Sequence, residues 1–297
     1  MSDIGFILSL PRSGSTLLLR LLNTSPDVEA DGEGWLMFFA LSPSLARQYR
    51  RIHRAQLDMA VKFFEDRASG EFEEFKESFV RAAFEFYRSR KGDAKIYIDK
   101  TPRYLLMTDL LVRQAPSAKV ILLKRHPVHV LISIANTWEK GYWSFAYHDI
   151  DVDQCLIELS KAVDRYRDDA RVHIMSYEDL VDDSELALGE LGQYLEVSHV
   201  STHLGEDSIG ESPLGDKSES QQESGIATRN RRHDEMISLN WYRYAWCKRY
   251  LRKHKGHFVA LGYSTGLRLE LNPKSLLKGF GDLGYALIRY VQVCLER

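Results

Sequence analysis

The first twenty-four residues constrain the fold of this chain more than any other stretch. An apolar run rich in β-forming residues, from Ile4 to Leu10, predicts a buried strand that Pro11 ends. A short Ser- and Gly-containing turn follows, and after Gly14 leucines recur at helical spacing: Leu17, Leu18, Leu21 and Leu22. A strand, a tight loop and a helix in this order direct backbone N–H groups and a helix N-terminus at an anion, usually a phosphate. The sequence therefore predicts a phosphate-binding loop before this helix.

The predicted loop resembles a Walker A loop without its lysine. Gly14 and Thr16 stand where the final Gly and the Ser/Thr of that motif stand. Ser15 occupies the position of the lysine, and the cation of this loop is Arg12. We therefore expect the loop to bind a phosphate group, with its positive charge at a different position from the lysine of P-loop nucleoside triphosphatases.

Three more strands follow, and polar residues stand where two of them end. The second, Lys95–Ile98, is followed by Lys100, and the third, Lys119–Leu123, is followed by Arg125; a fourth is expected at Val172–Met175. Helical patterns alternate with these strands, which predicts an α/β fold with a central parallel sheet flanked by helices. Ligands of such sheets bind at the carboxyl ends of the strands, where the first three loops meet.

The segments between the strands carry several further expectations. Residues 25–35 are interpreted as a loop that carries Glu29, Asp31 and Glu33. A long helical region is expected over residues 43–90, with an aromatic face that more simply packs in the core than lines a pocket: Phe72, Phe75, Phe79 and Phe86. The helix after Pro127 is expected to turn four side chains inward: Val130, Leu131, Ile134 and Trp138.

We expect one domain over residues 1–270, followed by an amphipathic helix over residues 271–297. Within the domain, residues 198–230 are poor in apolar side chains and predict a flexible lid. The final helix places apolar residues on one stripe: Leu276, Phe280, Leu283, Leu287, Tyr290 and Cys294. The sequence leaves three places for this stripe to dock: its own domain, a second subunit in a homodimer, or a membrane surface.

Composition excludes some functions. The net charge of −2 gives no overall attraction to nucleic acid, and the basic segment from Arg229 to Lys255 is better explained by an anion site beside the lid and a solvated helix face. The three cysteines are widely spaced, which suits a reducing compartment and shows no metal-ligand spacing. No apolar run is long enough to span a bilayer, and the first strand begins almost at Met1. We therefore expect a cytoplasmic protein, with peripheral membrane association through the last helix as the variant.

Two motifs, each on a predicted strand–loop–helix unit, resemble those of the sulfotransferase family. The first is Leu10-Pro11-Arg12-Ser13-Gly14-Ser15-Thr16, and the second is Arg125 with Ser133 eight residues later. Tyr177-Glu178-Asp179-Leu180 also recurs in many members of that family. The resemblance covers residues 4–263, and its layout is nearest to tyrosylprotein and bacterial or carbohydrate sulfotransferases. It implies a P-loop-like α/β fold and 3′-phosphoadenosine 5′-phosphosulfate as the sulfo donor.

The resemblance implies a set of donor-binding residues. The first motif would hold the 5′-phosphosulfate through Arg12, Ser13, Gly14, Ser15 and Thr16. Arg125 and Ser133 would hold the 3′-phosphate. Three residues at the end of the lid would replace a Gly-rich motif that other members carry: Ser224, Thr228 and Arg229.

It also implies three catalytic residues. Glu33, in a Gly-Glu pair after the first helix, would be the general base, and its alternative role is to cap a loop or helix. Lys100 would neutralise the leaving group, and its alternative role is a surface ion pair with Asp99. Arg12 would stabilise charge on the transferred group. Trp35 and the glycine before it replace the Glu and Arg that hold acidic peptides in tyrosylprotein sulfotransferases, which argues against a peptide acceptor.

The function implied is sulfo transfer to a hydroxyl of a carbohydrate, glycolipid or small metabolite. The acceptor is thus a small molecule or glycan, the product is adenosine 3′,5′-bisphosphate, and no metal is required. Two alternatives stay open from the residues alone. One is a P-loop nucleotide or small-molecule kinase, and the other is a non-catalytic protein that binds nucleotides or polyanions.

Overall fold

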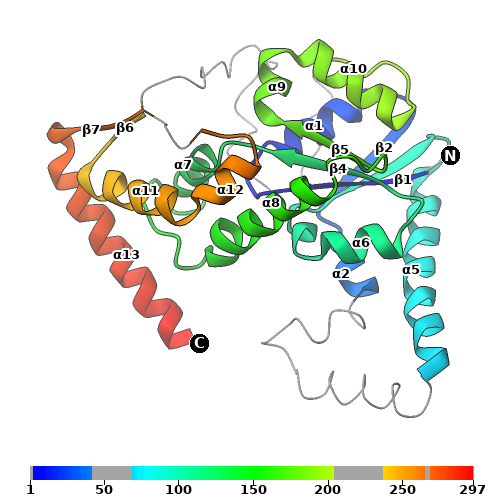
Figure 1. Cartoon of the computed structure of the whole chain (residues 1–297), viewed down its shortest axis with the longest axis horizontal. Helices are drawn as coiled ribbons and strands as arrows, with labels where there is room; N and C mark the ends of the chain where they lie inside the picture. The colour runs from blue at the N-terminus through cyan, green and yellow to red at the C-terminus, as the bar shows by residue number, and fades with distance from the viewer. Residues whose placement is uncertain (1–2, 42–68, 204–236, 265–267, 297) are drawn as a thin grey trace.

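The computed structural model describes residues 3–41, 69–203, 237–264 and 268–296 (Figure 1). Its centre is a sheet of five parallel strands in the order β2-β3-β1-β4-β5. Their bounds are β1 (Ile4–Ser9), β2 (Val28–Gly32), β3 (Ile96–Lys100), β4 (Lys119–Lys124) and β5 (Val172–Ser176). This arrangement confirms the predicted α/β fold with a central parallel sheet. Because β1 is the central strand and β3 and β4 are its two neighbours, the loops after β1, β3 and β4 lie beside one another.

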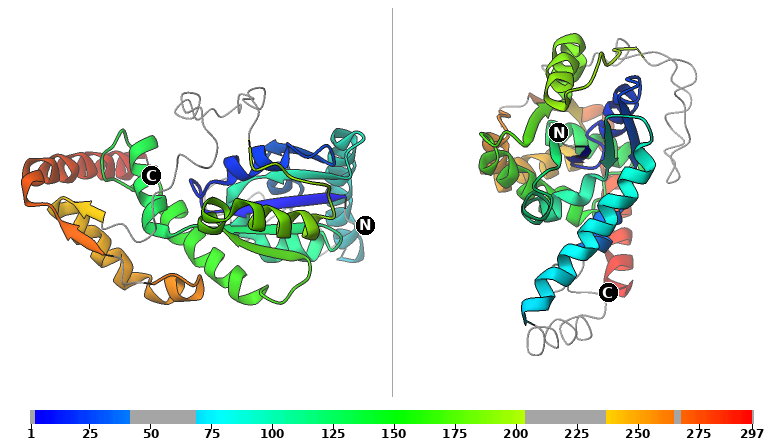
Figure 2. Two further views of the ribbon diagram at one scale, coloured as in Figure 1. Left: turned by 90° about the horizontal axis from the view of Figure 1, so that it is seen from above. Right: turned by 90° about the vertical axis from the view of Figure 1, so that its right-hand side faces the viewer.

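Helices cover both faces of the sheet (Figures 1 and 2). On one face lie α1 (Ser15–Leu22), α9 (Tyr177–Asp182) and α10 (Ser184–Leu195). The other face is covered by α5 (Ser69–Lys91), α6 (Thr108–Gln114), α7 (Pro127–Thr137) and α8 (Cys155–Arg165). Three short helices complete this part: α2 (Leu36–Ala40), η1 (Pro102–Met107) and η2 (Ile150–Gln154).

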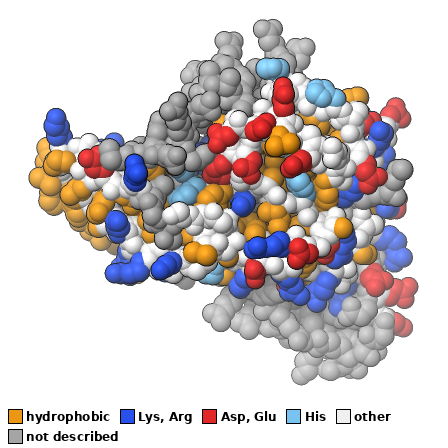
Figure 3. Space-filling model, turned by 45° about the horizontal axis from the view of Figure 1, so that its top comes forward, with side chains coloured by type: hydrophobic (Ala, Val, Ile, Leu, Met, Phe, Trp, Pro, Cys, Tyr) orange, Lys and Arg blue, Asp and Glu red, His pale blue; other side chains and the backbone are white. Residues whose placement is uncertain are grey.

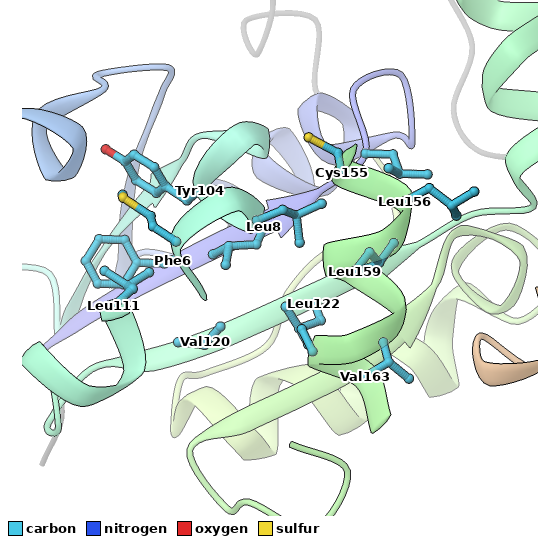
Figure 4. Close-up of a cluster of buried hydrophobic side chains, with 14 of the residues drawn as sticks. Phe6, Leu8, Tyr104, Leu111, Val120, Leu122, Cys155, Leu156, Leu159 and Val163 are labelled. Atoms are coloured by element: carbon cyan, nitrogen blue, oxygen red, sulfur yellow. The ribbon is translucent and has the colours of Figure 1, made fainter. Parts of the chain in front are cut away.

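The strands divide the core into two layers because successive side chains of a strand point to opposite faces. On β1, Phe6 and Leu8 pack with α6 and α8, whereas Ile7 packs with α1 and α10. Figure 4 shows the first of these layers, in which Leu122 lies among side chains of α8 such as Leu159. A strand buried on both faces is apolar without alternation, which is why β1 and β4 were predictable.

The strand β2 corrects the expectation that residues 25–35 form a loop. It is an edge strand that pairs with β3, with Val28 and Ala30 buried and Glu29 exposed. Polar and apolar residues alternate along β2, so it lacks the continuous apolar run that marks β1 and β4 in the sequence. The strand matters for function because it places Glu33 at the same sheet edge as the end of β3.

Two predicted core faces were partly wrong. In α5 the buried side chains are Val80, Ala83, Phe84 and Tyr87. Phe75 and Phe79 are half-buried, but Phe86 is 54% exposed. The side chain of Phe72 lies outside the described residues. Trp138 is the residue directly after α7, which ends at Thr137, and it is 38% exposed.

The chain then forms a second, smaller group of elements. These are β6 (Ile237–Leu239), α11 (Trp241–Lys253), α12 (Lys255–Ala260), β7 (Leu269–Leu271), η5 (Pro273–Ser275) and α13 (Leu276–Glu296). The strands β6 and β7 pair in parallel, and the first turns of α13 pack against the beginning of α11 (Figure 1). The predicted division at residue 270 stays a prediction, and most of the predicted lid lies outside the described residues.

The expected apolar stripe of α13 is present but does not pack inward. Four of its six members are more than half exposed: Leu276, Phe280, Leu287 and Tyr290. The buried positions of this helix are instead Gly279, Asp282 and Val293. Among the described residues, no helix combines the length and the apolarity that crossing a bilayer demands.

Candidate functional site

The loop between β1 and α1 has the backbone of an anion-binding turn. Arg12 has φ of 66° and Gly14 has φ of 93°, so the chain bends twice through the left-handed region before α1 begins. The first N–H groups of a helix have no partner within it and point at this loop. The Ser13 hydroxyl is fully buried and has no hydrogen-bond partner among the described residues. A buried hydroxyl in this state is suited to a ligand oxygen.

The structure brings together the two sequence motifs. Arg12 Nε donates to Ser133 Oγ across 3.2 Å, and Arg125 donates to the Arg12 carbonyl oxygen across 2.9 Å. The Arg125 guanidinium also lies over the ring of Tyr177, 4.2 Å from its centre. Two guanidinium groups and a hydroxyl therefore meet beside the loop, which is a strong local attraction for anionic groups.

The loop after β4 is held in place from both sides. Glu178 accepts the backbone N–H of His126 across 2.8 Å and the hydroxyl of Tyr263 across 2.7 Å. The ring of His126 accepts the N–H of Val128 and caps α7. Glu178 belongs to the third recurring motif, so that motif fixes the turn from which Arg125 projects.

Glu33 and Lys100 form an ion pair, with 3.1 Å between Oε1 and Nζ. The Lys100 side chain is 3% exposed and that of Glu33 is 29% exposed. The pair is set by the sheet, because Glu33 N–H donates to the Lys100 carbonyl oxygen at the end of the β2–β3 ladder. Gly32 makes room for the lysine: a Cβ there would lie 3.3 Å from Lys100 Cε.

Asp99 is not the partner of Lys100 that a surface ion pair would need. Asp99 is 2% exposed, and its carboxylate accepts hydrogen bonds from the hydroxyl groups of Tyr87, Tyr104 and Thr101 at 2.5, 2.9 and 2.7 Å. Burial raises the pKa of Asp99. Successive residues of β3 point to opposite sides, so Asp99 anchors the core while Lys100 faces the site.

A second polar group lies beside Glu33 that sequence reasoning missed. Arg103 makes a bidentate contact with Asp151 at 2.7 and 2.8 Å, and its guanidinium carbon is 5.9 Å from the centre of the Trp35 ring. The hydrogen bonds that Arg103 donates to Asp151 raise the pKa of Arg103, and the charge of Glu33 adds to this. Trp35 in turn stacks on Phe38 at 5.5 Å. The only sequence signal for this group was the position of Arg103 just after the Lys100 loop.

The remaining predicted residues divide into two groups. Ser15 is buried and Thr16 is half-buried in the first turn of α1, next to the loop. Ser224, Thr228 and Arg229 lie outside the described residues. Within the described part of the chain, no group of His, Cys, Asp and Glu side chains has the arrangement of a metal site.

The family of this chain follows from comparison with known proteins. Residues 6–201 match the model of the sulfotransferase family, which is about two thirds of the chain and includes both motifs. The chain belongs to the sulfotransferase family. This confirms the resemblance that the two motifs indicated.

Two individual proteins show what this chain is similar to. The chain is 36% identical over 160 residues to nodulation protein NoeE of Sinorhizobium fredii, a match that covers 52% of this chain. It spans only 36% of the length of that relative. Among solved structures, the sulfotransferase domain of the Synechococcus PCC 7002 olefin synthase superposes with a TM-score of 0.51 at 24% identity. That match covers 75% of this chain and 84% of the domain, and it supports the fold.

Proposed function

We propose that this chain transfers a sulfo group from 3′-phosphoadenosine 5′-phosphosulfate to a hydroxyl of a carbohydrate, glycolipid or small metabolite. The observation that carries the proposal is the Glu33–Lys100 pair at 3.1 Å, at the sheet edge where the lysine-free phosphate loop also ends. An acid and a buried amine at this position supply a proton acceptor and a cation next to a bound anion.

The donor would bind across the β1 and β4 loops. The backbone of the β1 loop, with Ser13 and Thr16, would hold the 5′-phosphosulfate. Arg125 and Ser133 would hold the 3′-phosphate, because a guanidinium presents a planar fork of donors that matches phosphate oxygens. The contact of Arg12 with Ser133 supports a single continuous site, since it joins the residues assigned to the two ends of the donor.

The reaction would be an in-line displacement at sulfur. The acceptor oxygen forms the new S–O bond as the bond between sulfur and the phosphate oxygen breaks, and the acceptor proton passes to the Glu33 carboxylate. Lys100 would neutralise the charge that develops on the departing phosphate oxygen, and Arg12 would stabilise the sulfo oxygens. The Glu33 carboxylate also supplies the counter-charge that a lysine with 3% exposure requires.

The surroundings of Glu33 support an acceptor with a ring. Trp35 and Phe38 offer stacked aromatic faces two and five residues after the base, and such faces pack against sugar or other rings. Arg103 adds a cation beside Trp35. This combination supports a glycan or a ring-containing metabolite better than an extended acyl chain.

Thermal unfolding with two ligands tests the proposal first. Adenosine 3′,5′-bisphosphate at about 100 times its dissociation constant should stabilise the protein by roughly 2.7 kcal/mol, whereas ATP with Mg²⁺ should not. Sulfate transfer from labelled donor to a panel of sugars would follow. A shift with ATP and Mg²⁺ alone would instead support a kinase, and bisphosphate binding without transfer to any acceptor would support a non-catalytic binding protein.

A further inference from the structure

Helix α13 exposes one continuous apolar face. Eight of its large apolar side chains are between 55% and 84% exposed: Leu276, Leu277, Phe280, Leu287, Ile288, Tyr290, Val291 and Leu295. At 3.6 residues per turn these positions fall on one side of the helix, and none of the charged residues of α13 lies among them. A contiguous exposed face of large apolar side chains is typical of an interaction site.

The opposite side of α13 is fixed to the domain by polar contacts. Asp282 is 1% exposed and accepts hydrogen bonds from Arg243 at 2.7 and 3.0 Å, from Asn240 at 2.7 Å and from the Trp143 N–H at 3.0 Å. Gly279 lies against Trp241, where a Cβ would come within 2.2 Å of the indole nitrogen. Rotating the apolar face inward would break these contacts and bury charge without a partner. The contacts of Asp282 and Gly279 therefore fix the orientation of α13 in which its apolar face is exposed.

The same part of the chain is strongly basic. Residues 237–296 contain ten Lys and Arg residues against three Asp and Glu residues, a formal charge of +7 in a chain whose net charge is −2. Most of these basic side chains are exposed: Lys248, Arg249, Arg252, Lys253, Lys255, Arg268, Lys274 and Lys278. Figure 3 shows hydrophobic side chains gathered at the end of the molecule that carries α13, with Lys and Arg side chains beside them.

We propose that the outer face of α13 binds the surface of a membrane that contains anionic lipids. An apolar helix face flanked by basic residues gains from both lipid contact and attraction to anionic headgroups. A second copy of this chain is a less favourable partner for this face, because a two-fold contact would bring two segments of charge +7 together. The helix would lie along the surface, since its Asp282 side remains attached to the domain.

Vesicle flotation with the full chain tests the proposal. The probes are vesicles of phosphatidylcholine alone and of phosphatidylcholine with phosphatidylglycerol in about a three-to-one ratio. The protein should bind the anionic vesicles and lose most of that binding with added salt. The variant Leu287→Glu/Val291→Glu should bind them at least about tenfold more weakly. Lys274→Gln/Lys278→Gln should weaken binding by up to about fivefold for each residue.

A matched control and a second measurement keep the outcomes distinct. Ser78→Glu/Ser89→Glu adds the same charge at exposed positions of α5 and should bind vesicles like the wild type, apart from a small general electrostatic loss. Unchanged stabilisation by adenosine 3′,5′-bisphosphate would show that each variant is folded. Sedimentation velocity over a range of concentrations should show a monomer. The proposal is overturned if no vesicle binds, if Leu287→Glu/Val291→Glu binds normally, or if that variant instead dissociates a dimer.

Discussion

Gly14 and Tyr177 lie so close that the loop between β1 and α1 accepts no side chain at this position. A Cβ on Gly14 would stand 2.3 Å from Cδ2 of Tyr177, and the glycine has φ of 93°. The same tyrosine ring carries the Arg125 guanidinium 4.2 Å from its centre. One aromatic ring thus sets the path of the β1 loop and the position of the cation assigned to the 3′-phosphate.

Replacing this glycine should damage both stability and donor binding. Gly14→Ala should lower the free energy of unfolding by about 2–5 kcal/mol, from the left-handed backbone and from overpacking against Tyr177. Urea unfolding measures the loss. Gly92→Ala is the matched control, because Gly92 has φ of 57° but no atom within 4 Å of the added Cβ, so it should lose only about 1 kcal/mol. Equal losses in the two variants would contradict the assigned role of Tyr177.

Removing the charge of Glu33 should affect turnover far more than donor affinity. Glu33→Gln should lower kcat by about 10²–10⁴-fold, because the amide accepts no proton but still accepts a hydrogen bond from Lys100. Labelled sulfate transfer gives kcat, and titration with adenosine 3′,5′-bisphosphate gives affinity. Glu29→Gln, on the exposed side of β2, should behave as wild type. Normal turnover in Glu33→Gln would remove Glu33 from the chemistry.

Truncating Arg125 should weaken binding of the 3′-phosphate specifically. Arg125→Ala should bind adenosine 3′,5′-bisphosphate about a hundredfold more weakly, whereas AMP, which lacks that phosphate, should lose much less. Arg125→Lys should fall between, because it keeps the charge and loses the fork. Calorimetry measures both ligands, with the exposed Arg113→Ala as control. If the affinities for the bisphosphate and for AMP fall equally, Arg125 stabilises the loop and does not bind the 3′-phosphate.

The central part of this fold was predictable because its signals are local. Continuous apolar runs marked β1 and β4, and the residues that follow them marked the phosphate loop and Arg125. The meeting of Arg12 with Ser133, 121 residues later, followed from the rule that parallel strands end at one edge. Spacing and topology together were sufficient to predict that these loops meet, and the roles of their residues in donor binding stay a prediction.

Other features that depend on contacts with residues distant in the sequence could not be predicted. The edge strand β2 alternates polar and apolar residues and looks like a loop until β3 pairs with it. The stripe of α13 left open whether it packs on its own domain, on a second subunit or on a membrane surface, whereas the buried Asp282, paired with Arg243, decides which side of the helix faces the domain. Arg103 was missed because its partner Asp151 lies 48 residues away. Pairings of this kind have no local periodicity.

Asp282 should also give the protein an acid-sensitive step. Burial alone would raise the pKa of Asp282, but hydrogen bonds from Arg243 and Asn240 hold it below the ordinary value of 3.8. Its contribution to stability is therefore complete above that value and is lost as the pH falls through the lowered pKa of the folded state.

Asp282→Asn should lower the free energy of unfolding at neutral pH by about 3–5 kcal/mol, because Arg243 loses its buried partner. The difference from wild type should shrink below about pH 4. Denaturant unfolding at a series of pH values measures it. Asp164→Asn is the control, since Asp164 pairs with Arg167 at 3.9 Å on the surface. A pH-independent difference would assign the loss to packing.

Because β2 is an edge strand, the segment after it can change more freely than the loops after β1 and β4. The loops after β1 and β4 spring from interior strands, so an exchange of their residues disturbs hydrogen-bonded neighbours on both sides. The segment from Glu33 through α2 follows an edge strand with one neighbour, and it carries Trp35 and Phe38. On the proposed assignment of the donor to the β1 and β4 loops, a graft at residues 34–41 is expected to change the choice of acceptor and to leave donor affinity unchanged.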